Sequence, residues 1–411
     1  MPLYGLVAGH AVSMTGNVLT LVALPLYVLG RTGSATLTGL TGVAATVPVV
    51  LGGTFGGPVI DRLGHRRASV LADLVGAVAV AAVPVLVLDH TTGLPLWGLL
   101  GLVLVSGLFD TPGQVARTAL LPEAASVAGV PIERAVGVFE AVERGARVLG
   151  APLAGVLVSV LGALQVLAID AASFAVSALL VARLVPAGLT AARDHAVGYW
   201  STLRTGIGFV ARDPLLRALV LLVMVTNMFD SAKSTVLLPV YAARELGGGL
   251  ALGLLFGASG FGALAGSLAF GAVGHRLPRR ATFVTGFCVA GGIPALTLAA
   301  GLPLPVLVAA AALGGLGAGA INPTISLIKL QRVPATVRAS VYGIIGAGAW
   351  AAMPLGALLG GVAVDTAGLT TTLLAVGMLY ILVTLTPALG GPWRTMNHPI
   401  SPPPELTQHA P

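Results

Sequence analysis

The sequence is a series of apolar runs, and this repetition limits the possible folds more than any other feature. A helix of about 20 apolar residues can cross the roughly 30 Å hydrocarbon core of a bilayer. Twelve candidate runs follow one another, at residues 6–30, 36–60, 68–88, 95–117, 145–163, 165–186, 215–241, 250–273, 281–300, 303–328, 338–362 and 369–389. We predict an all-α integral membrane protein with twelve transmembrane helices, because a barrel would show short alternating segments instead.

The composition indicates that lipid is the solvent of this chain. Hydrophobic residues make up 56% of the sequence and charged residues only 9%, whereas soluble domains average roughly 25% charged residues. The net charge is +7, but the basic residues stand in short clusters between apolar runs, which argues against nucleic-acid binding. Cys288 is the one cysteine, so an intrachain disulfide is excluded.

The distribution of basic residues predicts the orientation in the membrane. An even number of spans places both termini on one side, and 19 of the 22 Lys and Arg residues then fall on that side. Only Arg31, Lys233 and Arg244 fall on the other. Basic loops stay in the cytoplasm, so we expect both termini to be cytoplasmic. The first span alone argues for the inverse, since Arg31 follows it and no basic residue precedes it.

A repeated loop divides the spans into two sets of six. "DRLGHRR" (61–67) follows the second span, and "HRLPRR" (275–280) follows the eighth. We expect a six-helix half at 1–186, a cytoplasmic linker at 187–213, a second six-helix half at 214–390 and a disordered cytoplasmic tail at 391–411. Two such halves, with a substrate site between them near the midplane, are typical of secondary transporters.

The first copy of the repeat resembles the cytoplasmic loop motif of the major facilitator superfamily. The motif Gly-x-x-x-Asp-Arg-x-Gly-x-Arg-Arg is carried here by Gly57, Asp61, Arg62, Gly64, Arg66 and Arg67. Stretches at 13–40, 169–184, 206–220 and 333–343 are similar to the drug:proton antiporter branch, which contains macrolide and siderophore exporters. The resemblance implies a major facilitator fold and a multi-pass protein of a bacterial cell membrane. It implies a substrate only weakly, since one fold hosts many cargoes.

One position departs from that branch, whose members often carry an acid where Asn17 stands in the first span. An acid that takes part in proton coupling there has no counterpart here. In this superfamily spans 1, 4, 7 and 10 line the central cavity. They carry Asn17, Asp110, Gln114, Asn227, Asp230 and Asn322, and Trp350 and Met353 of span 11 could add apolar contact. Sparse polar groups in an apolar cavity suit a lipophilic or amphipathic molecule.

Charged residues inside spans are expensive in lipid and are therefore functional candidates. Asp110 is interpreted as a proton-carrying carboxylate or a contact for a cationic cargo, or else as a helix cap or an ion-pair partner of Arg117. Asp230 and Lys233, three residues apart, share a helix face. They form either a structural pair or a pair that opens when a proton or cargo replaces one partner.

Three further groups of charges lie near span ends. Glu140, Glu143, Arg144 and Arg147 are spaced for i,i+4 pairs, and we expect an inner gate and packing seam there, or else an exposed cytoplasmic edge. Asp73 and Asp170 are interpreted as structural, with Asp73 also able to receive a loop arginine.

The charged loop itself is predicted to be a gate. Asp61 stands at the C-terminal end of its helix, the unfavourable end for an acid, and therefore needs an outside partner. Arg66, Arg67 or the N-terminus of a helix of the other half, such as span 11, could supply it. We expect a latch that stabilises the outward-open state, so that Asp61→Asn favours the inward-open state.

The sequence indicates transport, not catalysis. We find no phosphate-binding loop, no Cys/His cluster with metal spacing and no room for a catalytic domain, so no cofactor is expected beyond the proton gradient. We predict a proton-coupled exporter of lipophilic or amphipathic small molecules. An importer or lipid flippase of the same fold is the alternative, and a channel or receptor fits less well. The expected partners are a small-molecule substrate, protons and the bilayer; the oligomeric state stays open.

Overall fold

The computed structural model describes residues 2–88, 95–186, 199–334 and 337–397. The described residues form helices and no strand, which confirms the predicted all-α class. The α-helices are α1 Pro2–Thr32, α2 Ala35–Leu63, α3 His65–Leu88, α4 Leu96–Val127, α5 Ile132–Leu161, α6 Ala163–Leu184, α7 Tyr199–Arg212, α8 Pro214–Ala232, α9 Leu238–Glu245, α10 Gly249–Val273, α11 Arg279–Phe287, α12 Ile293–Ala299, α13 Leu304–Arg332, α14 Arg338–Trp350, α15 Met353–Ala367 and α16 Leu369–Thr384.

Twelve helical segments of the described chain are long and apolar enough to cross a membrane, as predicted. The largest difference in boundaries concerns the fourth and fifth spans. We expected them to end at 117 and begin at 145, but α4 runs to Val127 and α5 begins at Ile132. Helix continues through these polar residues because both helices extend beyond the apolar layer, which a hydropathy pattern does not register.

Three spans of the C-terminal half are interrupted. The seventh consists of α8, a π-helical segment η1 (Lys233–Leu237) and α9. The ninth contains a second π-helical segment, η3 (Cys288–Gly292), between α11 and α12. The eleventh breaks between α14 and α15, just before Pro354. Proline lacks an N–H and clashes with the carbonyl four residues earlier, so this break has a local cause.

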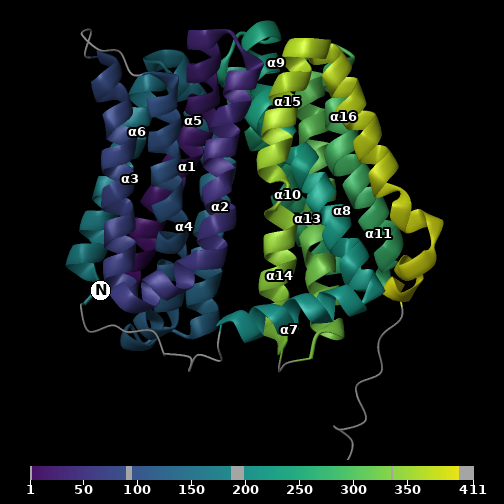
Figure 1. Cartoon of the computed structure of the whole chain (residues 1–411), viewed down its shortest axis with the longest axis horizontal. Coiled ribbons are helices and arrows are strands. Elements are labelled where there is room, and N and C mark those ends of the chain that lie inside the picture. The colour runs from purple at the N-terminus through teal and green to yellow at the C-terminus, as the bar shows by residue number, and fades with distance from the viewer. Residues whose placement is uncertain (1, 89–94, 187–198, 335–336, 398–411) are drawn as a thin grey trace, which may run out of the picture.

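The helices lie in two groups, α1–α6 and α8–α16, which pack against each other at the end that carries α9 (Figure 1). Facing glycines allow the close approach: a Cβ on Gly155 of α5 would come within 2.9 Å of Gly253 Cα of α10. A second seam joins α2 and α15, where a Cβ on Gly42 would lie 2.7 Å from Ala357 Cβ. Toward the opposite end, which carries α7, the ribbons of the two groups lie further apart (Figure 1). The close contacts between the halves therefore lie toward the α9 end.

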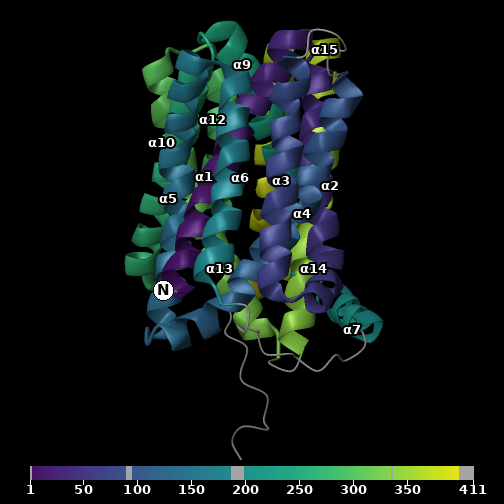
Figure 2. The same ribbon diagram turned by 90° about the vertical axis from the view of Figure 1, so that its left-hand side faces the viewer.

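Helix α7 lies across the bundle axis beneath the C-terminal group (Figures 1 and 2). It occupies the second part of the predicted linker, and a Cβ on its Gly206 would meet Ile344 of α14 at 2.9 Å. Residues 187–198 of that linker lie outside the described residues. The linker therefore contains a helix that is packed against the second half.

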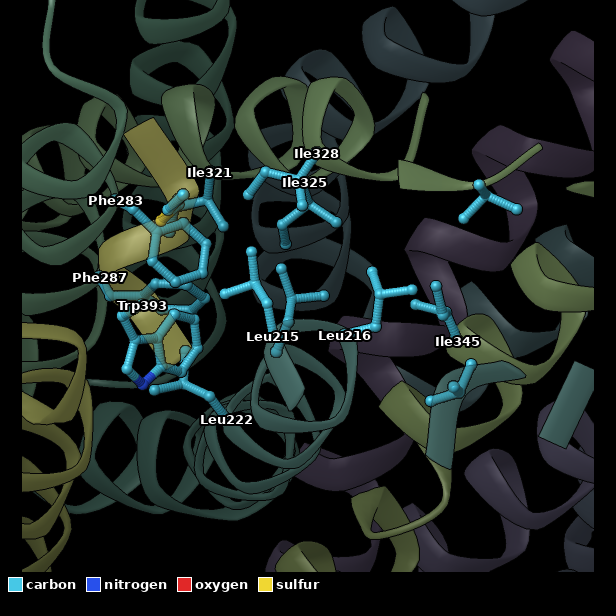
Figure 3. Close-up of a cluster of buried hydrophobic side chains, with 14 of the residues drawn as sticks. Leu215, Leu216, Leu222, Phe283, Phe287, Ile321, Ile325, Ile328, Ile345 and Trp393 are labelled. Carbon is cyan, nitrogen blue, oxygen red and sulfur yellow. The ribbon is translucent and has the colours of Figure 1, made fainter. Parts of the chain in front are cut away.

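The predicted tail differs from the structure at its start. Gly391–Asn397 forms a 3-10 helix, and Trp393 and Met396 are buried in the C-terminal hydrophobic cluster. The ring of Trp393 lies 5.9 Å from that of Phe283 in a tilted arrangement, beside Phe287 (Figure 3). An expectation of disorder from residue 391 overlooked the apolar area that one tryptophan buries. Residues 398–411 lie outside the described part of the chain.

Candidate functional site

Two cavities hold most of the predicted site residues, and the large one, of about 690 Å³, lies in the C-terminal half. Its wall is mainly apolar, with residues such as Leu219, Phe256, Ile321 and Ile345, and every lining residue except Arg147 comes from the C-terminal half. The polar or charged side chains on the wall include Asn227, Asp230, Ser231, Lys233, Ser234, Ser259, Asn322, Lys329 and Tyr380. Such a cavity can hold a drug-sized molecule and orient it by a few polar contacts.

Asp230 is the centre of the polar group on this wall. Its Oδ1 accepts a hydrogen bond from Lys233 Nζ at 2.7 Å, and its Oδ2 accepts one from the Tyr380 hydroxyl at 3.2 Å. Lys233 begins the π-helical segment η1, which changes the direction of the side chains that follow Asp230. The Asp230 side chain is 40% exposed and that of Lys233 is 17% exposed, so a ligand in the cavity can reach the pair.

The break in the eleventh span brings its backbone to the same cavity. Asn227 Nδ2 donates to the carbonyl of Ala349 at 2.9 Å, an oxygen that lies where α14 ends. Trp350 and Met353, on either side of the break, both line the cavity. A side-chain amide thus satisfies a carbonyl that the helix break leaves free.

The smaller cavity, of about 180 Å³, lies mainly within the N-terminal half. It contains Asp110, whose Oδ2 accepts hydrogen bonds from Asn17 Nδ2 at 3.1 Å and Gln114 Nε2 at 2.7 Å. The other oxygen, Oδ1, is buried without a partner. The predicted alternatives of a helix cap and of an ion pair with Arg117 are both wrong, because α4 continues past Asp110 and Arg117 binds another acid.

Asp170 is the second carboxylate of the small cavity, which sequence reasoning treated as structural. It accepts hydrogen bonds from the hydroxyls of Thr20 and Ser173. Gly16 permits this position, because a Cβ there would overlap the Asp170 carboxylate. Among the described residues neither Asp110 nor Asp170 forms a salt bridge.

A buried ion pair lies beside this cavity. Arg117 Nη1 donates to both oxygens of Asp73 at 3.1 and 3.0 Å, and the two side chains are 0% and 1% exposed. Ser177 donates to Asp73 at 2.6 Å, and Arg117 also reaches Ser13. The pair thus joins α1, α3, α4 and α6. The expectation that Asp73 receives a loop arginine is wrong, because its partners are Arg117, from within α4, and Ser177 of α6.

The two copies of the loop repeat do the same structural task. Arg66 donates to the carbonyls of Val185 and Ala182 at the end of α6, at 2.6 Å each. Arg280, the equivalent residue of the second copy, donates to those of Pro387 and Ala388 after α16. A cation is favourable at a helix C-terminus. Each arginine therefore ties the third helix of its half to the sixth.

The rest of the predicted gate is only partly described. Gly64 has a φ of 79°, as the tight turn between α2 and α3 requires, and Arg67 is exposed. The side chains of Asp61 and Arg62, and the surroundings of Gly57, lie outside the described residues. A latch between Asp61 and span 11 stays a prediction.

The charges at residues 140–147, in the middle part of α5, form two ion pairs near the protein surface. Arg144 lies 3.8 Å from Glu140, and Arg147 lies 2.6 Å from Glu143. These are the i,i+4 pairs expected from the spacing, and Arg147 also reaches the mouth of the large cavity. Exposed pairs of this kind contribute about 0.3–0.5 kcal/mol, so they do not hold the halves together.

The predicted site residues thus separate into two places. The large cavity takes Asn227, Asp230, Lys233, Asn322, Trp350 and Met353, whereas the small cavity takes Asn17 and Asp110 with Gln114 beside it. The π-helical segment separates the two, since Ser234 lines the large cavity and Thr235 the small one. Sequence reasoning missed Tyr380 and Lys329. Tyr380 has the only ionisable side chain in the apolar sequence of α16, so no spacing between residues indicated its role.

The comparisons with known proteins agree with this architecture. Residues 6–247 and 220–409 match the family model of the Major Facilitator Superfamily. The chain is 32% identical over 383 residues to the "Multidrug efflux pump Tap" of Mycolicibacterium fortuitum, with 90% of each protein covered. It is 30% identical over 388 residues to the protein of that name from Mycobacterium tuberculosis (strain ATCC 25618 / H37Rv), covering 92% of this chain and 90% of that pump.

Solved structures share the fold at low sequence identity. The nucleoside transporter NupG aligns with a TM-score of 0.79 at 15% identity, covering 96% of this chain and 99% of that one. A bacterial homologue of the iron transporter ferroportin in an inward-facing state aligns with a TM-score of 0.71 at 15% identity, covering 93% and 98%. Twelve spans around internal cavities define a multi-pass membrane transporter. This chain belongs to the Major Facilitator Superfamily, as the loop motif predicted.

Proposed function

We propose that this protein exports lipophilic or amphipathic small molecules from a bacterial cell in exchange for protons. The observation that carries the proposal is the cavity of about 690 Å³, whose apolar wall holds a few polar groups around Asp230. Multiply charged phosphates or sugars would require paired arginines or a dense array of hydrogen bonds. The similarity to two pumps named for multidrug efflux supports the same class of cargo.

In this proposal the two cavities have separate tasks. Cargo enters the large cavity from the α7 end, which the distribution of basic residues predicts to be cytoplasmic. Asp110 carries the proton, because its carboxylate is buried with neutral donors and one free oxygen. The segment η1 contacts both cavities through Ser234 and Thr235, so binding in one can alter the other as the halves rock.

Everted vesicles test the proposal directly. They are acidified inside, a panel of lipophilic cations and macrolides is added, and decay of the pH gradient is followed by a fluorescent dye. We expect cargo to accelerate the decay with the native protein and not with Asp110→Asn. Glu140→Gln is the matched control, because it removes an acid from an exposed pair that lies outside both cavities. If no cargo of a broad panel moves protons, the exchange mechanism is wrong.

A further inference from the structure

The turn between α1 and α2 is held by two charged residues of the other half. Asp365, near the end of α15, accepts hydrogen bonds from the Ala35 N–H at 3.0 Å and the Thr36 N–H at 2.8 Å. It also accepts one from the Ser34 hydroxyl at 2.8 Å. All three donors belong to the N-terminal half, whereas Asp365 belongs to the C-terminal half.

These donors are the ones that the helix itself leaves unsatisfied. The first N–H groups of an α-helix have no partner within the helix, and the helix dipole is positive there. Ser34 caps one of them by accepting from the Leu37 N–H at 3.2 Å. Asp365 accepts from the two that precede it, so the first turn of α2 is completed by a side chain of the opposite half.

Arg244, at the end of α9, contacts the other side of the same turn. Its Nη2 donates to the Gly33 carbonyl at 3.4 Å, just after α1 ends at Thr32. The C-terminal end of α1 is negative and the N-terminal start of α2 is positive, so each charge matches the helix end that it touches. Asp365 gains nothing from its own helix, because an acid near a C-terminus is unfavourable.

We propose that Asp365, with Arg244 as its weaker companion, is a positioning residue that holds the α9 end of the transporter closed. The proposal rests on alternating access as part of the proposed function. Opening at this end must separate α15 from α2, which are in backbone contact: a Cβ on Gly361 would come within 2.9 Å of Thr36 Cα. The hydrogen bonds of Asp365 therefore exist in one of the two states only and shift the equilibrium toward it.

This arrangement repeats, at the opposite end, the latch expected for Asp61. Asp365, near the C-terminal end of the eleventh span, reaches the N-terminus of the second span. The contact expected for Asp61 is the reverse one, from the end of the second span to the start of the eleventh. Asp61→Asn is expected to favour the state closed at the α9 end. Loss of Asp365 should favour the opposite state.

Spin-label distances across the α9 end test the proposal. Labels are placed on Val160 of α5 and Leu250 of α10, which are exposed, in a background where Cys288 is replaced by serine. Loss of a helix cap typically changes an equilibrium about fivefold. We expect Asp365→Ala to raise the ratio of the long-distance to the short-distance population by about that factor. Asp365→Asn, which keeps one acceptor, should raise it less, and Arg244→Gln less again.

Thr366→Ala is the matched control, because Thr366 is the next residue, is exposed and bonds only to carbonyls of its own helix. An unchanged distance distribution in folded Asp365→Ala, or the same change in Thr366→Ala, would overturn the proposal. A thermal-unfolding temperature of Asp365→Asn equal to that of the native protein would show that a shift in distances reflects a change between the two states and not misfolding. These distances are measured without cargo or a proton gradient. A failed transport assay with a positive distance shift therefore refutes the proposed function alone.

Discussion

The two halves treat buried charge in opposite ways. In the N-terminal half the cation Arg117 is fully buried and bound to Asp73, while Asp110 and Asp170 line a small cavity with neutral donors only. In the C-terminal half Asp230 and its cation Lys233 share the wall of a large cavity and are partly exposed. One half thus keeps carboxylates among neutral donors, and the other keeps an ion pair on a cavity wall.

The largest expected effect compares the two ion pairs. Arg117→Met leaves Asp73 buried without its cation, and breaking a buried pair costs about 3–5 kcal/mol in free energy of unfolding. Lys233→Met should cost about 1 kcal/mol, because water reaches its pair. Thermal unfolding in detergent measures both variants, with Arg144→Met, from an exposed pair, as the control. Equal losses for Arg117→Met and Lys233→Met would show that the difference in burial does not matter.

The second prediction separates coupling from cargo binding. Asp110→Asn should abolish cargo-dependent proton movement and leave the cargo Kd within about twofold, since Asp110 does not line the large cavity. Asp230→Asn removes the charge that holds Lys233 beside the cargo. It should weaken binding of a cationic cargo about tenfold, and coupled transport should be lost while the amount of folded protein stays the same.

Binding of a fluorescent cargo to purified protein, beside the vesicle assay, distinguishes the two variants. If Asp110→Asn lost binding and Asp230→Asn kept it, the tasks assigned to the two cavities would be exchanged. Normal transport by Asp230→Asn would reduce the Asp230–Lys233 pair to a structural feature.

The sequence predicted what depends on hydropathy and missed what depends on pairing across helices. Apolar run length sets the number of spans, and the loop motif indicated the family. No spacing rule could pair Arg117 with Asp73, because the two residues lie 44 positions apart on different helices. The same holds for Tyr380 and Asp230, which are separated by 150 positions. Only the packed bundle determines such partners.

The polar residues of the spans show the same difference between local contacts, which the sequence predicts, and contacts between helices, which it does not. Helix periodicity placed Asp230 beside Lys233, since the spacing of three residues within one helix is local information. Helix periodicity could not predict that Asn17 and Asn227 line different cavities. The position of a polar residue in an apolar run does not indicate which other helix it faces. Asp170 is interpreted from the sequence as structural because an acid is favourable near the start of a helix, but the structure places it on the same cavity as Asp110.

The smallest expected effect concerns the Tyr380 hydroxyl, which donates a hydrogen bond to Asp230 of the Asp230–Lys233 pair. Tyr380→Phe removes the hydroxyl that lies 3.2 Å from Asp230 Oδ2 and keeps the ring that packs on Phe229. A hydrogen bond of this kind contributes about 1 kcal/mol, so we expect cargo affinity to change about fivefold and folding to stay intact. The control is Thr366→Ala, whose hydroxyl bonds only within its own helix. Because Lys233 still holds Asp230, the change must be smaller than that of Asp230→Asn. If Tyr380→Phe changed cargo affinity as much as Asp230→Asn does, the tyrosine itself would have to contact the cargo.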